Sequence, residues 1–349
     1  MAALIALLAL VAILVLAVAA AIAFGGPRRP APMESVSDGF RAFDLMDLPP
    51  LRRFAARDGS ELAYRAYAPM GTGKDACVVL IHGSASRSDR VHSLARGFAR
   101  AGYAVLVPDM RGHGESGRKG CIGYIGQLED DLEDLVTAHA APGRTSLVGF
   151  SAGGGFALRF AADRRAGLFR NYLLMAPFLN QSASTYRPGS GGWISVGLPR
   201  ILGLLLLNAL GIRRFNDLPV SAFALSPKAQ EQLTGGYSYS LAMNFRPHND
   251  YRADIATAAG PLEVLVGAND DQFHAERFAS EFKASRTPTR VTVLDGVGHI
   301  DLTIAEVAVD AAVQAIERMN RGALDPTSAC ADEAHSTPLP VPLTSTGAV

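Results

Sequence analysis

The sequence predicts an α/β fold with a mostly parallel central sheet, helices on both faces and a helical cap inserted after the sixth strand. Short runs rich in Val, Ile and Leu alternate with segments whose apolar residues recur at helical spacing. Such runs are typical of strands buried on both faces of a parallel sheet, and strand–helix alternation is the pattern of α/β proteins. One long interval interrupts the alternation and predicts the cap.

Length and composition exclude several classes of protein. The 349 residues are 48% hydrophobic and 19% charged, which excludes a mainly disordered chain. The 33 basic and 33 acidic residues cancel, so we expect no nucleic-acid partner. The three cysteines (Cys77, Cys121 and Cys330) predict no disulfide framework, and neither they nor the eight histidines have the spacing of a metal site.

An apolar run, Ala2–Phe24, follows the first residue. As a helix it spans roughly 34 Å at about 1.5 Å per residue, enough to cross a hydrocarbon core about 30 Å thick. Its length and the lack of a preceding Lys or Arg favour an uncleaved transmembrane helix or signal anchor over residues 1–25. Because Ala21-Ile22-Ala23 resembles a cleavage site, a cleaved signal peptide and a secreted or periplasmic protein are the alternative.

The nearest positive charges, Arg28, Arg29 and Arg41, all follow this run. The positive-inside rule therefore predicts a single-pass membrane protein whose main domain lies in the cytoplasm. Residues 26–50 are rich in Pro, Gly and Ser and predict a linker. We expect a folded domain over residues 51–320 and a disordered tail over residues 321–349, which contain four prolines and no apolar period.

The folded domain begins with a predicted hairpin, in which Leu51–Ala56 and Glu61–Ala68 flank Asp58-Gly59. Six further strands are predicted from short apolar runs. They are Cys77–Ile81, Tyr103–Val107, Ser146–Val148, Tyr172–Met175, Leu262–Val266 and Val291–Leu294. Helical spacing appears around Leu94 and around Leu132, and a closing helix is predicted from Ile304 to Met319.

About 85 residues separate Met175 from Leu262, which is too long for a plain crossover connection. This interval contains an apolar run, Ile201–Ile212, that is too short to cross a bilayer. We therefore predict a mostly helical insertion over residues 179–250.

The sharpest chemical signal is Gly149-Phe150-Ser151-Ala152-Gly153, which matches G-x-S-x-G. The motif lies between a predicted strand and a predicted helix, the context of a nucleophile elbow. In such a turn only small neighbours are tolerated, and the serine oxygen stands above the sheet at a helix N-terminus. Ser151 is therefore the predicted nucleophile.

A serine nucleophile needs a base, and the base needs an acid that orients it. Downstream, one strand runs into Asp270 and Asp271, and the next runs into a glycine-flanked histidine, His299. Both positions lie at the carboxyl ends of strands, the edge at which an open α/β sheet places its site. We predict His299 as the base and Asp270 as the acid, with Asp271 as the alternative acid.

An oxyanion hole requires two backbone N–H groups aimed at the developing charge. The residue after the nucleophile, Ala152, supplies one. The loop after the strand Cys77–Ile81 reads His82-Gly83-Ser84, so Ser84 is the predicted second donor, and His82 is expected to hold this loop by hydrogen bonds.

Residues 112–117 match the dinucleotide motif G-x-G-x-x-G. The match lacks the helix that should follow at once and the acidic residue expected about 20 positions later. No cofactor is predicted.

Five stretches resemble the α/β-hydrolase family, in the group that includes monoacylglycerol lipases, lysophospholipases and proline iminopeptidase-like enzymes. They are VVLIHGSAS (78–86), VLVPDMRGHGES (105–116), LVGFSAGG (147–154), LEVLVGANDD (262–271) and VLDGVGHID (293–301). The resemblance implies the α/β-hydrolase fold, with the insertion as its cap. It assigns Ser151, Asp270 and His299 to a catalytic triad and the Ser84 and Ala152 amides to the oxyanion hole. A serine nucleophile disfavours the haloalkane and epoxide hydrolases of this family.

The predicted activity is hydrolysis of a carboxylic ester through an acyl-enzyme. An apolar cap and a membrane anchor favour a lipid-like ester, such as a monoacylglycerol or a lysophospholipid, or another small apolar ester. A peptidase or thioesterase of the same fold is the alternative, as is a catalytically silent, membrane-tethered binding protein. The oligomeric state does not follow from the sequence.

Overall fold

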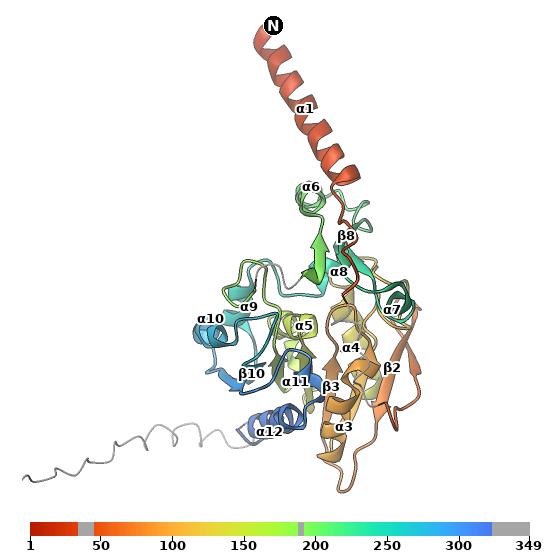
Figure 1. Ribbon diagram of the computed structural model, residues 1–349, viewed down its shortest axis with the longest axis vertical. Coiled ribbons are helices and arrows are strands. Elements are labelled where there is room, and N and C mark those ends of the chain that lie inside the picture. The colour runs from red at the N-terminus through yellow and green to blue at the C-terminus, as the bar shows by residue number, and fades with distance from the viewer. Residues whose placement is uncertain (34–44, 188–191, 323–349) are drawn as a thin grey trace, which may run out of the picture.

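The computed structural model describes residues 1–33, 45–187 and 192–322. Its central sheet has eight strands in the order β1-β2-β4-β3-β5-β6-β10-β11 (Figure 1). Their bounds are β1 Arg52–Ala55, β2 Glu61–Tyr67, β3 Cys77–Ile81, β4 Ala104–Pro108, β5 Thr145–Phe150, β6 Asn171–Met175, β10 Leu262–Gly267 and β11 Arg290–Leu294. The β1–β2 and β2–β4 pairs are antiparallel and all other pairs are parallel, so both the mostly parallel sheet and the opening hairpin are confirmed.

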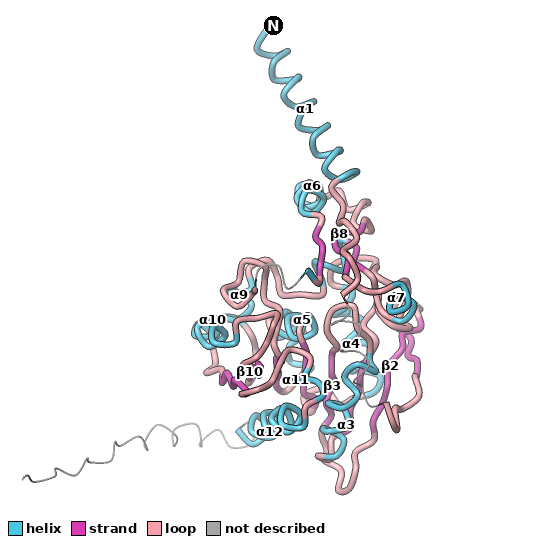
Figure 2. The backbone as a smooth tube through the Cα atoms, in the orientation of Figure 1, coloured by secondary structure: helices cyan, strands magenta, loops and turns pink. Residues whose placement is uncertain are grey.

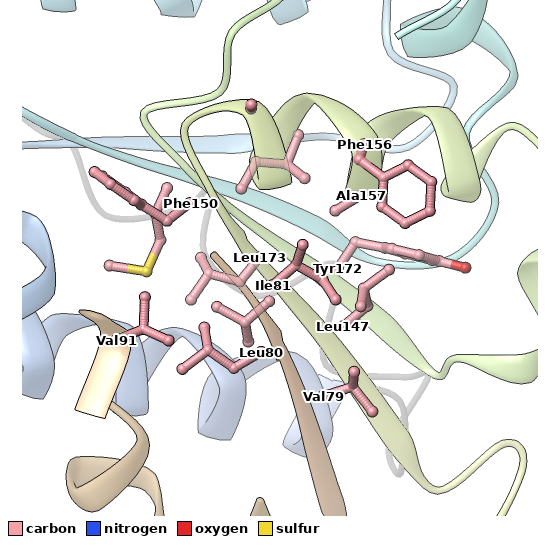
Figure 3. Packing of buried hydrophobic residues seen from close by; sticks show 14 of the residues in the cluster. Val79, Leu80, Ile81, Val91, Leu147, Phe150, Phe156, Ala157, Tyr172 and Leu173 are labelled. Atoms are coloured by element: carbon pink, nitrogen blue, oxygen red, sulfur yellow. The ribbon is translucent and has the colours of Figure 1, made fainter. Parts of the chain in front are cut away.

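The central strands are buried along their whole length. Every residue of β3, β5, β6 and β10 is buried, as their continuous apolar sequences predict. Figure 3 shows side chains of β3, β5 and β6 between Phe156 and Ala157 of α5 on one side and Val91 on the other. The site at the strand ends therefore rests on a closely packed core.

Helices cover both faces of the sheet (Figure 2). One group contains α3 (His92–Arg100), α11 (Asp301–Ile304) and α12 (Glu306–Gly322), and the other contains α4 (Gln127–His139) and α5 (Ala152–Ala161). The predicted closing helix is interrupted at Ala305, where the backbone is extended, so Ile304 belongs to α11 and Val307 points to solvent. A short helix, α10 (Phe278–Glu281), and single 3₁₀ turns complete the domain.

The insertion between β6 and β10 forms the cap. Its helices are α6 (Leu198–Ala209), α7 (Pro227–Gln232) and α8 (Tyr239–Asn244), and α9 (Tyr251–Thr257) leads back to the sheet. A small antiparallel sheet, β7 (Ile194–Val196), β8 (Pro219–Phe223) and β9 (Gly236–Ser238), was absent from the helical prediction. These strands have three to five residues, too few for a period to be recognised.

The N-terminal run forms α1 (Ala2–Phe24), which has no buried residue and extends away from the rest of the protein (Figure 1). Its length and mean hydropathy of 3.2 fit a membrane span. Within the predicted linker, Met33 N–H donates to the Ala224 carbonyl of the cap, whereas residues 34–44 lie outside the described residues. The predicted tail also lies outside them, except for Arg321 and Gly322 at the end of α12.

Candidate active site

Ser151 occupies the turn between β5 and α5, with φ 55° and ψ −117°. A positive φ is strained for a residue with a Cβ, and such strain is stored at functional sites. Backbone hydrogen bonds hold the turn, because Ser151 N–H donates to the Met175 carbonyl and Phe178 N–H donates to the Ser151 carbonyl. The tight strand-to-helix turn predicted from G-x-S-x-G is therefore present, with Ser151 at its tip.

The glycines of the motif are required by close backbone packing. A Cβ added to Gly149 would lie 2.1 Å from the Gly153 carbonyl oxygen, and one added to Gly153 would lie 2.4 Å from the His82 oxygen. Both neighbours are backbone atoms that cannot rotate aside. The elbow consequently presses α5 against β5 and against the loop after β3.

His299 lies between Ser151 and Asp270. The distance from His299 Nε2 to Ser151 Oγ is 3.1 Å, and from His299 Nδ1 to Asp270 Oδ2 it is 2.8 Å. An ionised carboxylate only accepts, so Nδ1–H donates to Asp270 and Nε2 is left to accept the Ser151 hydroxyl proton. The structure thus brings His299 into contact with Ser151, which lies 148 positions before it, and with Asp270, which lies 29 positions before it.

The two candidate acids have different environments. Asp270 is 3% exposed, and its second oxygen accepts the N–H groups of Gln272 and Phe273. Asp271 is exposed and lines the pocket instead of contacting His299. The geometry therefore favours Asp270 over Asp271 as the partner of His299.

The His299 ring is 8% exposed and lies between two aromatic rings. Its centroid is 4.8 Å from that of Phe150 and 5.3 Å from that of Phe273. The loop before His299 also packs closely against the end of β10, because a Cβ on Gly267 would lie 2.2 Å from the Val297 carbonyl oxygen. Packing therefore limits the rotation of the imidazole.

The two predicted oxyanion donors, Ser84 and Ala152, both line the pocket beside Ser151. Among the described residues, neither backbone N–H has a hydrogen-bond acceptor. Ala152 is the first residue of α5, so its N–H also lies at the positive end of a helix. Both groups are free to bind a developing negative charge.

A residue of the cap holds the loop after β3, residues 82–86, and the sequence did not predict this contact. The hydroxyl of Tyr237, on β9, accepts the Ala85 N–H at 2.7 Å, and Thr234 N–H donates to the Ala85 carbonyl. Ala85 has φ 59°, so these bonds hold a strained residue directly after Ser84. Nothing in the local sequence marks Tyr237, because its partner lies 152 positions away.

Two buried histidines, His82 and His113, also hold the loop after β3 and the Tyr237 hydroxyl in place. His82 Nδ1–H donates to the Gly83 carbonyl, and Nε2 accepts the Met110 N–H, as expected for a loop-holding residue. His113 Nε2 accepts the Tyr237 hydroxyl at 2.8 Å. Burial lowers the pKa of both imidazoles, and for His113 the neighbouring His82 lowers it further. Both rings are therefore neutral acceptors at neutral pH.

The pocket above Ser151 has a volume of about 350 Å³. Its walls are mainly apolar and come from the cap, the loops of the sheet and Met33 of the N-terminal segment. The apolar lining residues include Phe150, Phe178, Trp193, Ile194, Val196, Ile201, Val220, Phe223 and Phe245. Two cations, Arg90 and Arg246, and one carboxylate, Asp271, also line it.

Comparison with known proteins identifies the family. Residues 72–299 match the family described as serine aminopeptidase, S33. The chain is also 33% identical over 231 residues to a monoacylglycerol lipase of Mycolicibacterium smegmatis, covering 62% of this chain and 78% of that enzyme.

Solved structures agree on the fold. A monoacylglycerol lipase of Paleococcus ferrophilus superposes with a TM-score of 0.54 at 20% identity, covering 73% of this chain and 97% of that one. A membrane phospholipase A, described as a bacterial virulence factor, gives 0.52 at 17% identity and covers 91% and 98% of the two chains. Since the family match spans more than half of its residues, the chain belongs to the serine aminopeptidase S33 family of α/β hydrolases.

Proposed function

We propose that this chain is a membrane-tethered serine hydrolase that cleaves carboxylic esters through an acyl-enzyme. One observation carries the proposal: the hydrogen-bonded series Ser151–His299–Asp270 opens into a mainly apolar pocket beside two unpaired amides. An imidazole nitrogen within hydrogen-bond distance of a serine hydroxyl is the arrangement that activates a weak oxygen nucleophile.

The reaction has two halves. His299 Nε2 takes the Ser151 proton as Oγ attacks the ester carbonyl, and the Ser84 and Ala152 amides hold the oxyanion. His299 then protonates the leaving alcohol, and the acyl group remains on Ser151. In the second half, His299 takes a proton from water, which attacks the acyl-enzyme and releases the acid. Asp270 fixes the imidazole tautomer and stabilises the imidazolium.

The walls of the pocket support a lipid-like substrate. Aromatic and aliphatic side chains of the cap and sheet loops favour an acyl chain over a polar group. The similarity to a monoacylglycerol lipase also supports a lipid-like substrate. A monoacylglycerol or a lysophospholipid has the apolar chain and single ester that such a pocket accommodates.

The pocket offers little for the substrate of an aminopeptidase. A free amino terminus requires buried acidic partners, but Asp271 is the single carboxylate among the described lining residues, and it is exposed. The cap acids Asp217 and Glu231 do not line the pocket. Ester hydrolysis therefore fits the site better than peptide hydrolysis.

The tether is α1, which we infer to be an uncleaved, single transmembrane helix. Arg28 and Arg29 are exposed just after it, so the positive-inside rule puts the catalytic domain in the cytoplasm. The packing of α1 against the cap also supports retention of the helix, because cleavage would remove a partner of α6.

The test is turnover of p-nitrophenyl esters of increasing chain length by the detergent-solubilised full chain. We expect medium or long chains to be preferred over acetate, and Ser151→Ala to abolish turnover. Ser182→Ala, which alters an exposed serine outside the pocket, is the matched control and should retain wild-type rates. A folded wild-type chain that turns over none of these esters would contradict the proposal.

A further inference from the structure

Arg246 is a buried guanidinium in the pocket without a countercharge. Its side chain lines the pocket and is 9% exposed. It donates to Gln181 Oε1, Met243 Sδ and Asn249 Oδ1, all of which are neutral, and its Nε–H has no acceptor. Within the described part of the chain, no carboxylate pairs with it.

The other cation of the pocket has a different environment. Arg90 lies 3.3 Å from the Asp89 carboxylate, so its charge is compensated inside the protein. The charged groups that influence Arg246 include Arg159, which is also a cation and pairs with Glu129. Buried charges in proteins are normally paired, because removing an ion from water is costly.

We propose that Arg246 is an anion subsite that binds a phosphate or carboxylate of the ester substrate. The charge of this guanidinium is uncompensated and its side chain lines a mainly apolar pocket, where its terminal N–H groups can form short, charge-assisted hydrogen bonds to such groups. This inference rests on the proposed ester hydrolysis and narrows its substrate class from neutral to anionic esters.

The experiment compares kcat/KM for matched neutral and anionic esters in the full chain. One pair is 1-decanoylglycerol and its 3-phosphate; the other is p-nitrophenyl decanoate and the p-nitrophenyl monoester of decanedioic acid. A charge-assisted bond is worth about 1.5–3 kcal/mol, so wild type should prefer one anionic ester by roughly 10–100-fold. The pair that shows the preference distinguishes phosphate from carboxylate recognition.

Arg246→Gln should abolish this preference, and Arg246→Lys should retain part of it. Arg252→Gln removes an exposed guanidinium outside the pocket and should leave the preference unchanged. Equal rates for neutral and anionic esters in wild type, or an equal loss for both in Arg246→Gln, would overturn the subsite but not ester hydrolysis.

Binding of decyl phosphate, decanoate and decanol, measured by calorimetry, tests the subsite without turnover. We expect at least one anion to bind wild type more tightly than decanol, and Arg246→Gln to remove the difference. If all three bind alike, the subsite is wrong whether or not esters are hydrolysed.

A separate observation concerns the outer surface of the cap. Helix α6 is apolar on both sides: Leu204 is fully buried, whereas the opposite face exposes large aliphatic side chains. The exposed residues of this face and the turn after it are Leu198, Leu202, Leu205, Leu206, Leu210 and Ile212. A helix that is apolar all round is stable in lipid or inside a protein, and twelve residues are too few to span a bilayer.

Helix α6 is fixed to the end of α1. The guanidinium of Arg200 donates to the Ile22 and Ala23 carbonyls, which are left unpaired at the helix C-terminus. Gly203 allows close approach, because a Cβ there would lie 2.8 Å from the Ile22 side chain. In Figure 1, α1 extends outward while α6 is seen nearly end-on beside its base, so α6 lies across the C-terminal end of α1.

Exposed cations directly follow both helices. Arg28 and Arg29 follow α1, and Arg213 and Arg214 follow α6. Apolar side chains flanked by Arg are the pattern of helices that lie in the membrane interface beside anionic headgroups. We propose that the exposed face of α6 inserts into the lipid bilayer that α1 crosses. Because Ile201 and Val196 also line the pocket, the part of the pocket wall that they form then lies beside the bilayer.

The test uses the full chain in phosphatidylglycerol–phosphatidylcholine vesicles, labelled with an environment-sensitive dye at Leu206→Cys. Val307→Cys, on an exposed apolar residue of α12, is the matched control. We expect lipid-borne quenchers to quench the dye at residue 206 and aqueous iodide to quench it at residue 307. Equal iodide accessibility at the two positions would overturn the proposal, because α1 anchors both variants equally.

Discussion

The two walls of the pocket are built in different ways. The sheet wall places Ser151, Ala152 and His299 on backbone turns in which glycines pack against carbonyl oxygens at distances that exclude any Cβ. The cap wall consists of apolar side chains on short strands and on α6, whose outer face is also apolar. This difference between the walls indicates that the catalytic groups are positioned by backbone geometry, whereas the substrate is selected by the side chains of the cap.

The largest expected effect is on the sheet wall, at the acid. Asp270→Asn keeps the size of the side chain but favours the wrong imidazole tautomer, so kcat should fall by about 10⁴-fold. Asp271→Asn alters the adjacent carboxylate, which does not contact His299, and should change kcat by less than about tenfold. Steady-state kinetics on one ester measures both; a larger loss in Asp271→Asn would reverse the assignment of the acid.

The backbone packing of the elbow is the next target. Gly153→Ala puts a methyl group 2.4 Å from the His82 carbonyl oxygen, and overpacking of this kind destabilises by about 1–3 kcal/mol. Gly167→Ala is the matched control, because its Cβ would meet open space. Urea unfolding should show a lower free energy of unfolding for Gly153→Ala alone. Equal stability of the two variants would show that the elbow is not closely packed.

One residue connects the two walls. Tyr237→Phe removes the cap hydroxyl that accepts the Ala85 N–H, so we expect about a tenfold lower kcat and a loss of about 1–3 kcal/mol in stability. Tyr172→Phe removes a buried hydroxyl that donates to the Ala166 carbonyl outside the pocket, and should lower stability without lowering kcat. If both variants keep wild-type kcat, the cap does not position the loop after β3 that contains Ser84.

The sequence predicted the sheet wall better than the cap wall for a physical reason. The elbow, His299 and Asp270 are each marked by local requirements: small residues at a tight turn and polar residues directly after buried strands. Tyr237 contacts Ala85, which lies 152 positions away, and no local pattern reveals such a contact. Arg246 bonds mainly to neutral neighbours in its own segment, and the sequence does not show that its charge is buried in the pocket. The strands of the cap are likewise too short to show alternation.

The smallest expected effect is a pH dependence of stability. Burial lowers the pKa of His82 and His113 below the ordinary value of 6.5, so below that pH the unfolded state binds more protons than the folded state. Stability should therefore fall as pH falls from about 6.5, by up to about 1.4 kcal/mol per pH unit for each ring. Urea unfolding at several pH values measures this slope, and His113→Gln should reduce it; an unchanged slope would contradict the neutral, buried state of His113.

The central claim is that Ser151 is a nucleophile activated by His299 in a formed active site. Fluorophosphonate labelling of the full chain, followed by mass mapping of the modified peptide, tests it most directly. The account predicts one adduct on Ser151, formed rapidly in wild type and at least about 100-fold more slowly in His299→Ala. An adduct on another residue, or none on a folded wild-type chain, would contradict it.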